Sequence, residues 1–191
     1  MDIQRINVKL LAQAPAGFKL DPFLAIFGRW RHEESPEVWV DLADYAHMAQ
    51  GQGIAIIGKR GSFSVDETPP GIGLLYAGKK GFEGSNEQRI VEAFRRCLAL
   101  TSALTAEAEY PSALELTPAR WELVFNDRLD TPNTDETDAT LRPAISSALD
   151  TLFGGGNYQI QREADPQRRY AFSITVANAV GAEDLLQRAA R

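Results

Sequence analysis

The side chains best suited to chemistry lie together in the segment VDLADYAHM, at the end of an expected strand. This segment supplies two carboxylates, a phenol and an imidazole, from Asp41, Asp44, Tyr45 and His47. A carboxylate near a histidine can orient the imidazole as a general base or tune its pKa. These four residues are therefore the candidate catalytic group. The alternative is structural, because acids at strand ends are commonly solvated and Asp44 can form a turn by accepting backbone N–H groups.

Three arginines are the candidate ligand-binding residues. Arg29 and Arg31 flank Trp30 near the end of an expected helix, and Arg128 lies in a polar loop. They could hold an anionic ligand facing residues 41–47. Cations near a helix C-terminus also complement the helix dipole, so the arginines at 29 and 31 have a structural explanation as well. Spacing alone leaves both interpretations open.

The sequence predicts no metal and no cofactor. The two histidines, His32 and His47, lie on different expected elements, and neither C-x-x-C nor H-E-x-x-H occurs. The glycine-rich region, residues 51–84, contains no phosphate-binding motif between a strand and a helix. There is no G-x-S-x-G motif, and Cys97 falls on the apolar face of a helix, where a buried thiol is expected.

The 191-residue chain is acidic, with 20 Lys and Arg against 26 Asp and Glu and a formal net charge of −6. A net-negative chain lacks the cationic surface that drives nucleic-acid affinity, so we expect no nucleic-acid binding. The charge is unevenly spread. Basic pairs (Lys59-Arg60 and Lys79-Lys80) lie at expected turns, where they could meet an acidic partner, and nine acids lie within residues 107–138, where they could attract a basic partner.

The expected cellular compartment follows from the absence of disulfide and targeting signals in the sequence. A single cysteine excludes an intramolecular disulfide and indicates a reducing environment. The N-terminus has no apolar core of a signal peptide, and no stretch approaches the roughly 20 apolar residues that span a bilayer. We therefore expect a cytoplasmic protein that makes no membrane contact.

The first half of the chain predicts a strand, a helix and further strands. Residues 6–12 read as a strand, and Asp21 is expected to cap a helix that has Pro22 in its first turn and ends before Ser35-Pro36. Val38, Val40 and Leu42 alternate with other residues, which indicates a half-buried strand. The glycine-rich region predicts three short strands of an antiparallel meander, at residues 54–57, 62–65 and 72–76.

The second half is predicted to be richer in helix. Helical spacing of apolar residues covers 86–106, and Ser85 with Gln88 matches a capping box. The alternation of Trp121, Leu123 and Phe125 indicates a strand. Residues 126–138 are expected to form a loop, with Thr140 capping a helix that ends at the glycines 154–156. Residues 158–160 and 170–176 predict a hairpin, and residues 182–190 predict a final helix.

These elements indicate an α+β fold in which helices cover one or two mostly antiparallel sheets, in the order β-α-β-β-β-α-β-α-β-β-α. We expect a single domain spanning residues 1–191. Because both halves begin with a strand, a helix and antiparallel strands, an internal duplication into residues 1–110 and 118–191 stays open.

Several short motifs resemble a bacterial family that has no assigned activity. They are D-Y-A-H within residues 41–58 followed by a G-Q-G strand, G-L-L-Y at 73–76 and N-D-R-L at 126–129. The resemblance covers roughly residues 20–155. Lys59 departs from the pattern, since a histidine is expected there. The resemblance implies a grouping and no mechanism.

Two classes of function remain. The first is a non-catalytic binding or assembly module that acts through protein–protein contacts, including a homodimer formed through an edge strand, because no set of residues satisfies the roles of an active site. The alternative is a small-molecule enzyme or ligand-binding protein with its site around Asp44, Tyr45 and His47.

Overall fold

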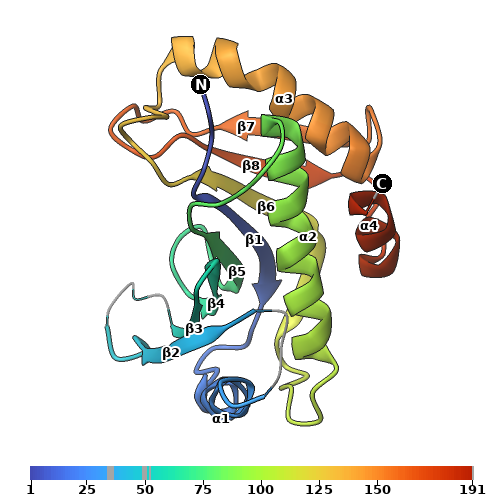
Figure 1. The fold of residues 1–191 in the computed structure, drawn as a ribbon. Helices are drawn as coiled ribbons and strands as arrows, with labels where there is room; N and C mark the ends of the chain where they lie inside the picture. Colours follow the sequence, from blue (N-terminus) through green and yellow to red (C-terminus); the bar gives the residue numbers. More distant parts are fainter. Residues whose placement is uncertain (34–36, 49–50, 52, 191) are drawn as a thin grey trace.

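The computed structural model describes residues 1–33, 37–48, 51 and 53–190. Within them the strands form one antiparallel eight-stranded sheet in the order β2-β3-β4-β5-β1-β6-β8-β7, and helices pack on it, which confirms the α+β class (Figure 1). The elements are β1 (Ile6–Gln13), α1 (Asp21–Trp30), β2 (Trp39–Asp44), β3 (Ile54–Gly58), β4 (Gly61–Asp66), β5 (Gly73–Gly78), α2 (Asn86–Thr105), β6 (Glu115–Phe125), α3 (Asp135–Phe153), β7 (Tyr158–Arg162), β8 (Ala171–Val176) and α4 (Ala182–Ala189).

The predicted order has one strand too few between α1 and α2. Four strands, β2 to β5, lie between these helices instead of three. The segment beginning at Trp39 and all three segments of the glycine-rich region pair with a neighbouring strand. Strand β1 lies between β5 and β6 and joins the strands of both halves into one sheet.

Two helix starts differ from the sequence prediction. Helix α1 begins at Asp21 itself, so Asp21 lies in the first turn and Leu20 occupies the cap position. Helix α3 begins at Asp135, five residues before Thr140, because the Thr134 hydroxyl accepts the Thr137 N–H at 3.2 Å. The loop expected over 126–138 therefore ends at Thr134. Helix α1 ends at Trp30, which agrees with the expected end before Ser35-Pro36; Ser35 and Pro36 themselves lie outside the described residues.

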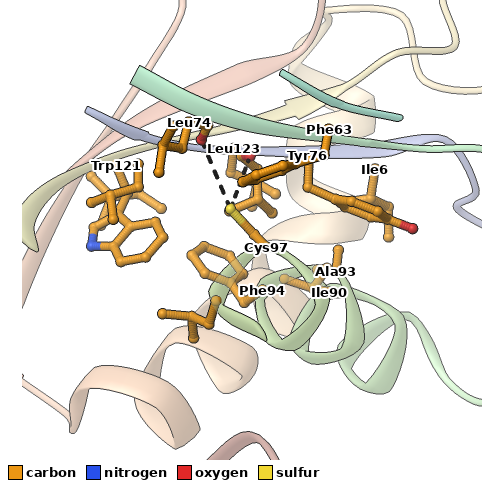
Figure 2. Close-up of a cluster of buried hydrophobic side chains, with 14 of the residues drawn as sticks. Ile6, Phe63, Leu74, Tyr76, Ile90, Ala93, Phe94, Cys97, Trp121 and Leu123 are labelled. Carbon is orange, nitrogen blue, oxygen red and sulfur yellow. Dashed lines mark hydrogen bonds between the residues drawn. The ribbon is translucent and has the colours of Figure 1, made fainter. Parts of the chain in front are cut away.

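The core lies between the sheet and the helices. Figure 2 shows Phe94 and Cys97 of α2 beside Trp121, Leu123 and Leu74 of the sheet. The Cys97 thiol is fully buried, and Sγ donates weakly to the carbonyl oxygens of Val8 at 3.5 Å and Leu74 at 3.9 Å. The Phe94 and Trp121 ring centroids lie 5.5 Å apart, so α2 faces the Trp121 side of the sheet.

Ring contacts place the other helices on the same face. Phe153 of α3 also packs on Trp121, and Phe27 of α1 packs on Phe63 of β4, at centroid distances of 6.0 and 6.1 Å. Helix α4 packs against α2 and α3. In the described part of the chain, no helix crosses the centre of the opposite face of the sheet, and this face carries the candidate site.

Candidate functional site

Polar side chains cross the helix-free face in two rows. Asn7 and Lys9 of β1 alternate with the core residues Ile6, Val8 and Leu10, so they point away from the helices. Strand pairing extends each position across the sheet. The first row is Ser62, Ala77, Asn7, Val124 and Ala171; the second is Ser64, Leu75, Lys9, Glu122 and Ser173.

A buried ion pair lies at the centre of this face. Lys9 and Asp66 are each 1% exposed, and Lys9 Nζ donates to Asp66 Oδ2 at 2.5 Å and to the Thr68 carbonyl at 2.8 Å. The Thr68 hydroxyl donates to the same Asp66 oxygen at 2.6 Å. Gly73 makes room for the lysine stem, because a Cβ at this glycine would lie 3.0 Å from Lys9 Cε. The local sequence thus fixes a charged pair beneath the surface of the sheet.

Glu122 is the cross-strand neighbour of Lys9. Burial raises the pKa of the Glu122 carboxyl; the Lys9 ammonium lowers it, and the Asp66 carboxylate raises it further. Glu122 therefore gains a proton more readily than an exposed glutamate. The site thus holds one ion-paired acid, Asp66, and a second acid, Glu122, whose carboxyl pKa is raised.

These residues form the floor of a groove of about 1040 Å³. Seven cationic residues and three acids line the groove, although the whole chain carries a net negative charge; the acids are Asp66, Glu122 and Glu163. The cations other than Lys9 lie just outside strands, either before a strand begins or after one ends. Because the strands are antiparallel, the starts of β1 and β8 lie beside the ends of β5 and β6, so these cations gather at one end of the groove. They are Arg5, Lys79, Lys80, Arg128, Arg168 and Arg169. The groove is thus polarised, with cations at one end and the Lys9–Asp66–Glu122 group toward the other.

Several of these groups lack partners within the part of the chain that the structure describes. No acid there lies at ion-pair distance from Lys80, Arg128 or Arg169, whereas Arg5 is 3.8 Å from Asp127. Two buried oxygens that line the groove, Oδ1 of Asn7 and Oδ1 of Asp66, accept no hydrogen bond from the described residues. Asn7 lies between Ala77 and Val124, which offer no side-chain donor. An unpaired buried acceptor is energetically costly, and both of these oxygens lie beneath the groove.

The loop after β6 places Arg128 at the groove by its own hydrogen bonds. Asp127 Oδ1 accepts the backbone N–H groups of Leu129 and Asp130 at 3.2 and 3.3 Å. At the end of the loop, the Asn133 amide donates to the carbonyls of Glu163 and Asp165 beside the β7–β8 connection. This fixed loop leaves Leu129 93% exposed next to Arg128.

The predicted catalytic residues lie elsewhere, on and after the edge strand β2. The Asp41 carboxylate accepts the Leu42 N–H at 2.8 Å, and the Asp44 carboxylate accepts the Ala46 N–H at 2.9 Å. Asp44 thus makes the turn contact of the structural alternative, and Asp41 is exposed on β2. Tyr45 and His47 are exposed in the following turn, and within the described residues no hydrogen bond joins His47 to either acid.

The three candidate arginines are separated. Arg29 forms ion pairs with Glu107 at 2.7 Å and Glu109 at 3.1 Å, which fasten α1 to the segment after α2. Arg31 follows α1 and is exposed. Only Arg128 among the three lines the groove. The acids of residues 107–138 are also spread over several elements, and many of them are paired within the fold, as Glu107 is.

No protein-family model matches the chain, and no curated protein matches it. The resemblance to a bacterial family stays a prediction. Among the described residues no three His, Cys, Asp or Glu side chains cluster as metal ligands would. None of the helices that the structure describes is long and apolar enough to cross a bilayer.

Sequence reasoning missed the floor of the groove. A signal was present, because polar residues alternate with apolar ones in Ile6-Asn7-Val8-Lys9-Leu10 and again in Ser62-Phe63-Ser64-Val65-Asp66. Period-2 alternation predicts a polar face of a sheet. What the sequence could not supply was the strand order that brings these two segments onto the same face.

Proposed function

We propose that this protein is a non-catalytic binding module whose groove takes an acidic segment of a partner protein. The observation that carries the proposal is the concentration of cations, seven of them in one groove of a chain whose net charge is −6. Electrostatic complementarity of this kind steers an oppositely charged partner and fixes its register. The arginine guanidinium suits carboxylates in particular, because its fork of N–H groups matches both oxygens.

The acceptors on the floor favour a peptide chain over a simple anion. An extended acidic segment can place carboxylates at the cationic end and direct backbone N–H groups toward the carboxylates of Glu122 and Glu163, which also line the groove. A sulfate ion carries no proton at neutral pH and would offer no such donors. The exposed Leu129 beside Arg128 offers an apolar contact to a protein partner.

The lining disfavours nucleic acid. Proteins that bind single strands stack bases on aromatic side chains, and none of the described residues that line the groove is aromatic.

The test is a binding titration with a fluorescent glutamate-rich peptide, followed by fluorescence anisotropy at low and moderate salt. The variant Lys80→Gln/Arg128→Gln/Arg169→Gln removes three exposed cations of the groove. Exposed ion pairs contribute about 0.2–1 kcal/mol each, so the triple variant should bind roughly 3- to 150-fold more weakly. Arg31→Gln, which removes an exposed cation outside the groove, should leave the affinity unchanged.

Two outcomes would contradict the proposal. One is equal binding of the peptide by the wild type and the triple variant. The other is tighter binding of a thymidine oligonucleotide of the same charge than of the peptide, which would indicate a nucleic-acid site.

The predicted homodimer and the alternative ligand site around Asp44, Tyr45 and His47 stay predictions. Light scattering measures the oligomeric state. The variant His47→Ala tests the alternative site in any activity assay.

A further inference from the structure

A second cavity lies on the helix-covered side of the sheet, between α1, β2 and α2. Its volume is about 350 Å³, which is within the usual range for sites that bind small molecules. It shares no lining residue with the groove described above. It therefore constitutes a separate site with its own ligand chemistry.

Most of the wall of this cavity is apolar. The lining includes the indole residues Trp30 and Trp39 together with Ala99, Leu100 and Ala103 of α2. Ala99 and Ala103 are exposed positions of α2, and their small side chains leave the space open. Trp30 is held in place, because its indole N–H donates to Glu107 at 2.6 Å. Aromatic side chains in an apolar wall favour a planar, largely apolar ligand.

The polar groups favour an acidic ligand. Three guanidinium groups, from Arg60, Arg95 and Arg96, line the cavity against two carboxylates, Glu33 and Glu37. The Glu37 carboxylate is buried and accepts the Arg60 backbone N–H at 3.1 Å and its Nε at 3.3 Å. Glu37 and Arg60 are therefore engaged with each other, which leaves two further guanidinium groups in the lining against the one carboxylate of Glu33.

Arg95 is the guanidinium best placed to receive an anion. Its side chain is 42% exposed, and it donates to Glu92 through Nε and one terminal nitrogen, at 2.5 and 2.8 Å. Among the described residues the second terminal nitrogen makes no hydrogen bond, so its donors are available to a carboxylate. Arg96, in contrast, is engaged with Glu92 and with the hydroxyl of Tyr76. A carboxylate on the ligand would thus meet Arg95 while its ring packs against the apolar wall.

From these contacts we infer that the cavity binds a small planar aromatic carboxylic acid. The apolar walls supply the contact area, and the guanidinium of Arg95 selects the charge. This site acts independently of the acidic-segment groove, and either one can fail without the other.

The experiment is isothermal titration calorimetry of the full chain with 2-naphthoate. The neutral isostere naphthalene-2-carboxamide and the cation 2-naphthylmethylamine are the matched ligands. We expect measurable binding of 2-naphthoate, at least fivefold weaker binding of the carboxamide and none of the amine up to about 1 mM. Arg95→Gln should weaken naphthoate binding at least fivefold and bring it level with the carboxamide, whereas Arg31→Gln should change nothing.

A filling variant tests the location. Ala99→Trp places an indole in the cavity from an exposed helix position, and it should abolish binding while the melting temperature stays close to that of the wild type. Ala103→Phe serves the same purpose if the first variant unfolds. The inference is overturned if 2-naphthoate does not bind at about 1 mM, if the three ligands bind equally, or if a folded filling variant still binds.

Discussion

Replacing Lys9 by methionine tests the buried charged pair directly. Methionine keeps the apolar stem over Gly73 but removes the ammonium, and Asp66 then keeps only the Thr68 hydroxyl as a donor. Both side chains are 1% exposed, so the carboxylate would stay buried without a counter-charge. Loss of one partner from such a pair costs about 3–5 kcal/mol. For a chain of this size that corresponds to a fall of roughly 6–20 °C in melting temperature.

The assay is urea unfolding followed by circular dichroism, and a double variant supplies the internal control. Lys9→Met/Asp66→Asn leaves no buried charge, so it should be more stable than Lys9→Met alone. Lys59→Met, at an exposed turn, should change the free energy of unfolding by less than about 0.5 kcal/mol. The reasoning is refuted if Lys9→Met costs less than about 1 kcal/mol, or if the double variant is no more stable than the single one.

Three further predictions concern Glu122, Cys97 and Ser85. Burial raises the pKa of Glu122 in the folded chain, so the free energy of unfolding should fall as pH rises through that pKa. The variant Glu122→Gln should lack this pH-dependent fall when urea unfolding is measured over a range of pH. A pH profile identical to that of the wild type would contradict the prediction. Burial also raises the pKa of the Cys97 thiol to about 12, so an aromatic disulfide reagent should label it only on unfolding, and fast labelling of the native chain would refute its burial. Ser85→Ala removes the cap of α2 and should cost about 1 kcal/mol in urea unfolding, whereas Ser85→Asp should retain most of the stability.

The sequence predicted local structure well where a signal is contained within a few residues. The capping box of Ser85 and Gln88 forms as expected, with both reciprocal hydrogen bonds present. The alternation of Trp121, Leu123 and Phe125 correctly placed three buried side chains on one face of β6. Each of these signals depends on neighbours along the chain, so no tertiary information was needed.

Helix starts were less predictable because two capping signals competed. Thr134 and Thr140 are both N-cap residues by type, and Pro143 favoured the later start because proline is tolerated in a first turn. The chain uses Thr134, which adds acids at 135, 136 and 138 to the positive end of the helix dipole. Pro143 then lies inside α3. The favourable dipole contacts explain why the longer helix forms.

The candidate site depended on information that the sequence alone does not contain. The carboxylates of Asp41 and Asp44 stood out because they are close to a histidine in the sequence, yet they serve the backbone of β2 and its turn. The groove requires β4, β5, β1, β6 and β8 to lie side by side in that order. Only this order brings Arg128 together with Arg169 and Lys80 at the cationic end. Long-range strand pairing was therefore the missing step.

The helix-free face of the sheet is proposed as a binding surface for an acidic protein segment. Amide chemical-shift mapping of the labelled protein with the glutamate-rich peptide tests this residue by residue. We expect the shifted signals to cluster on the two rows of the groove and on the loop of Arg128 and Leu129, and to recover at high salt. Shifts confined to β2 and the turn of His47, or spread over the helices, would show that the peptide does not bind this face.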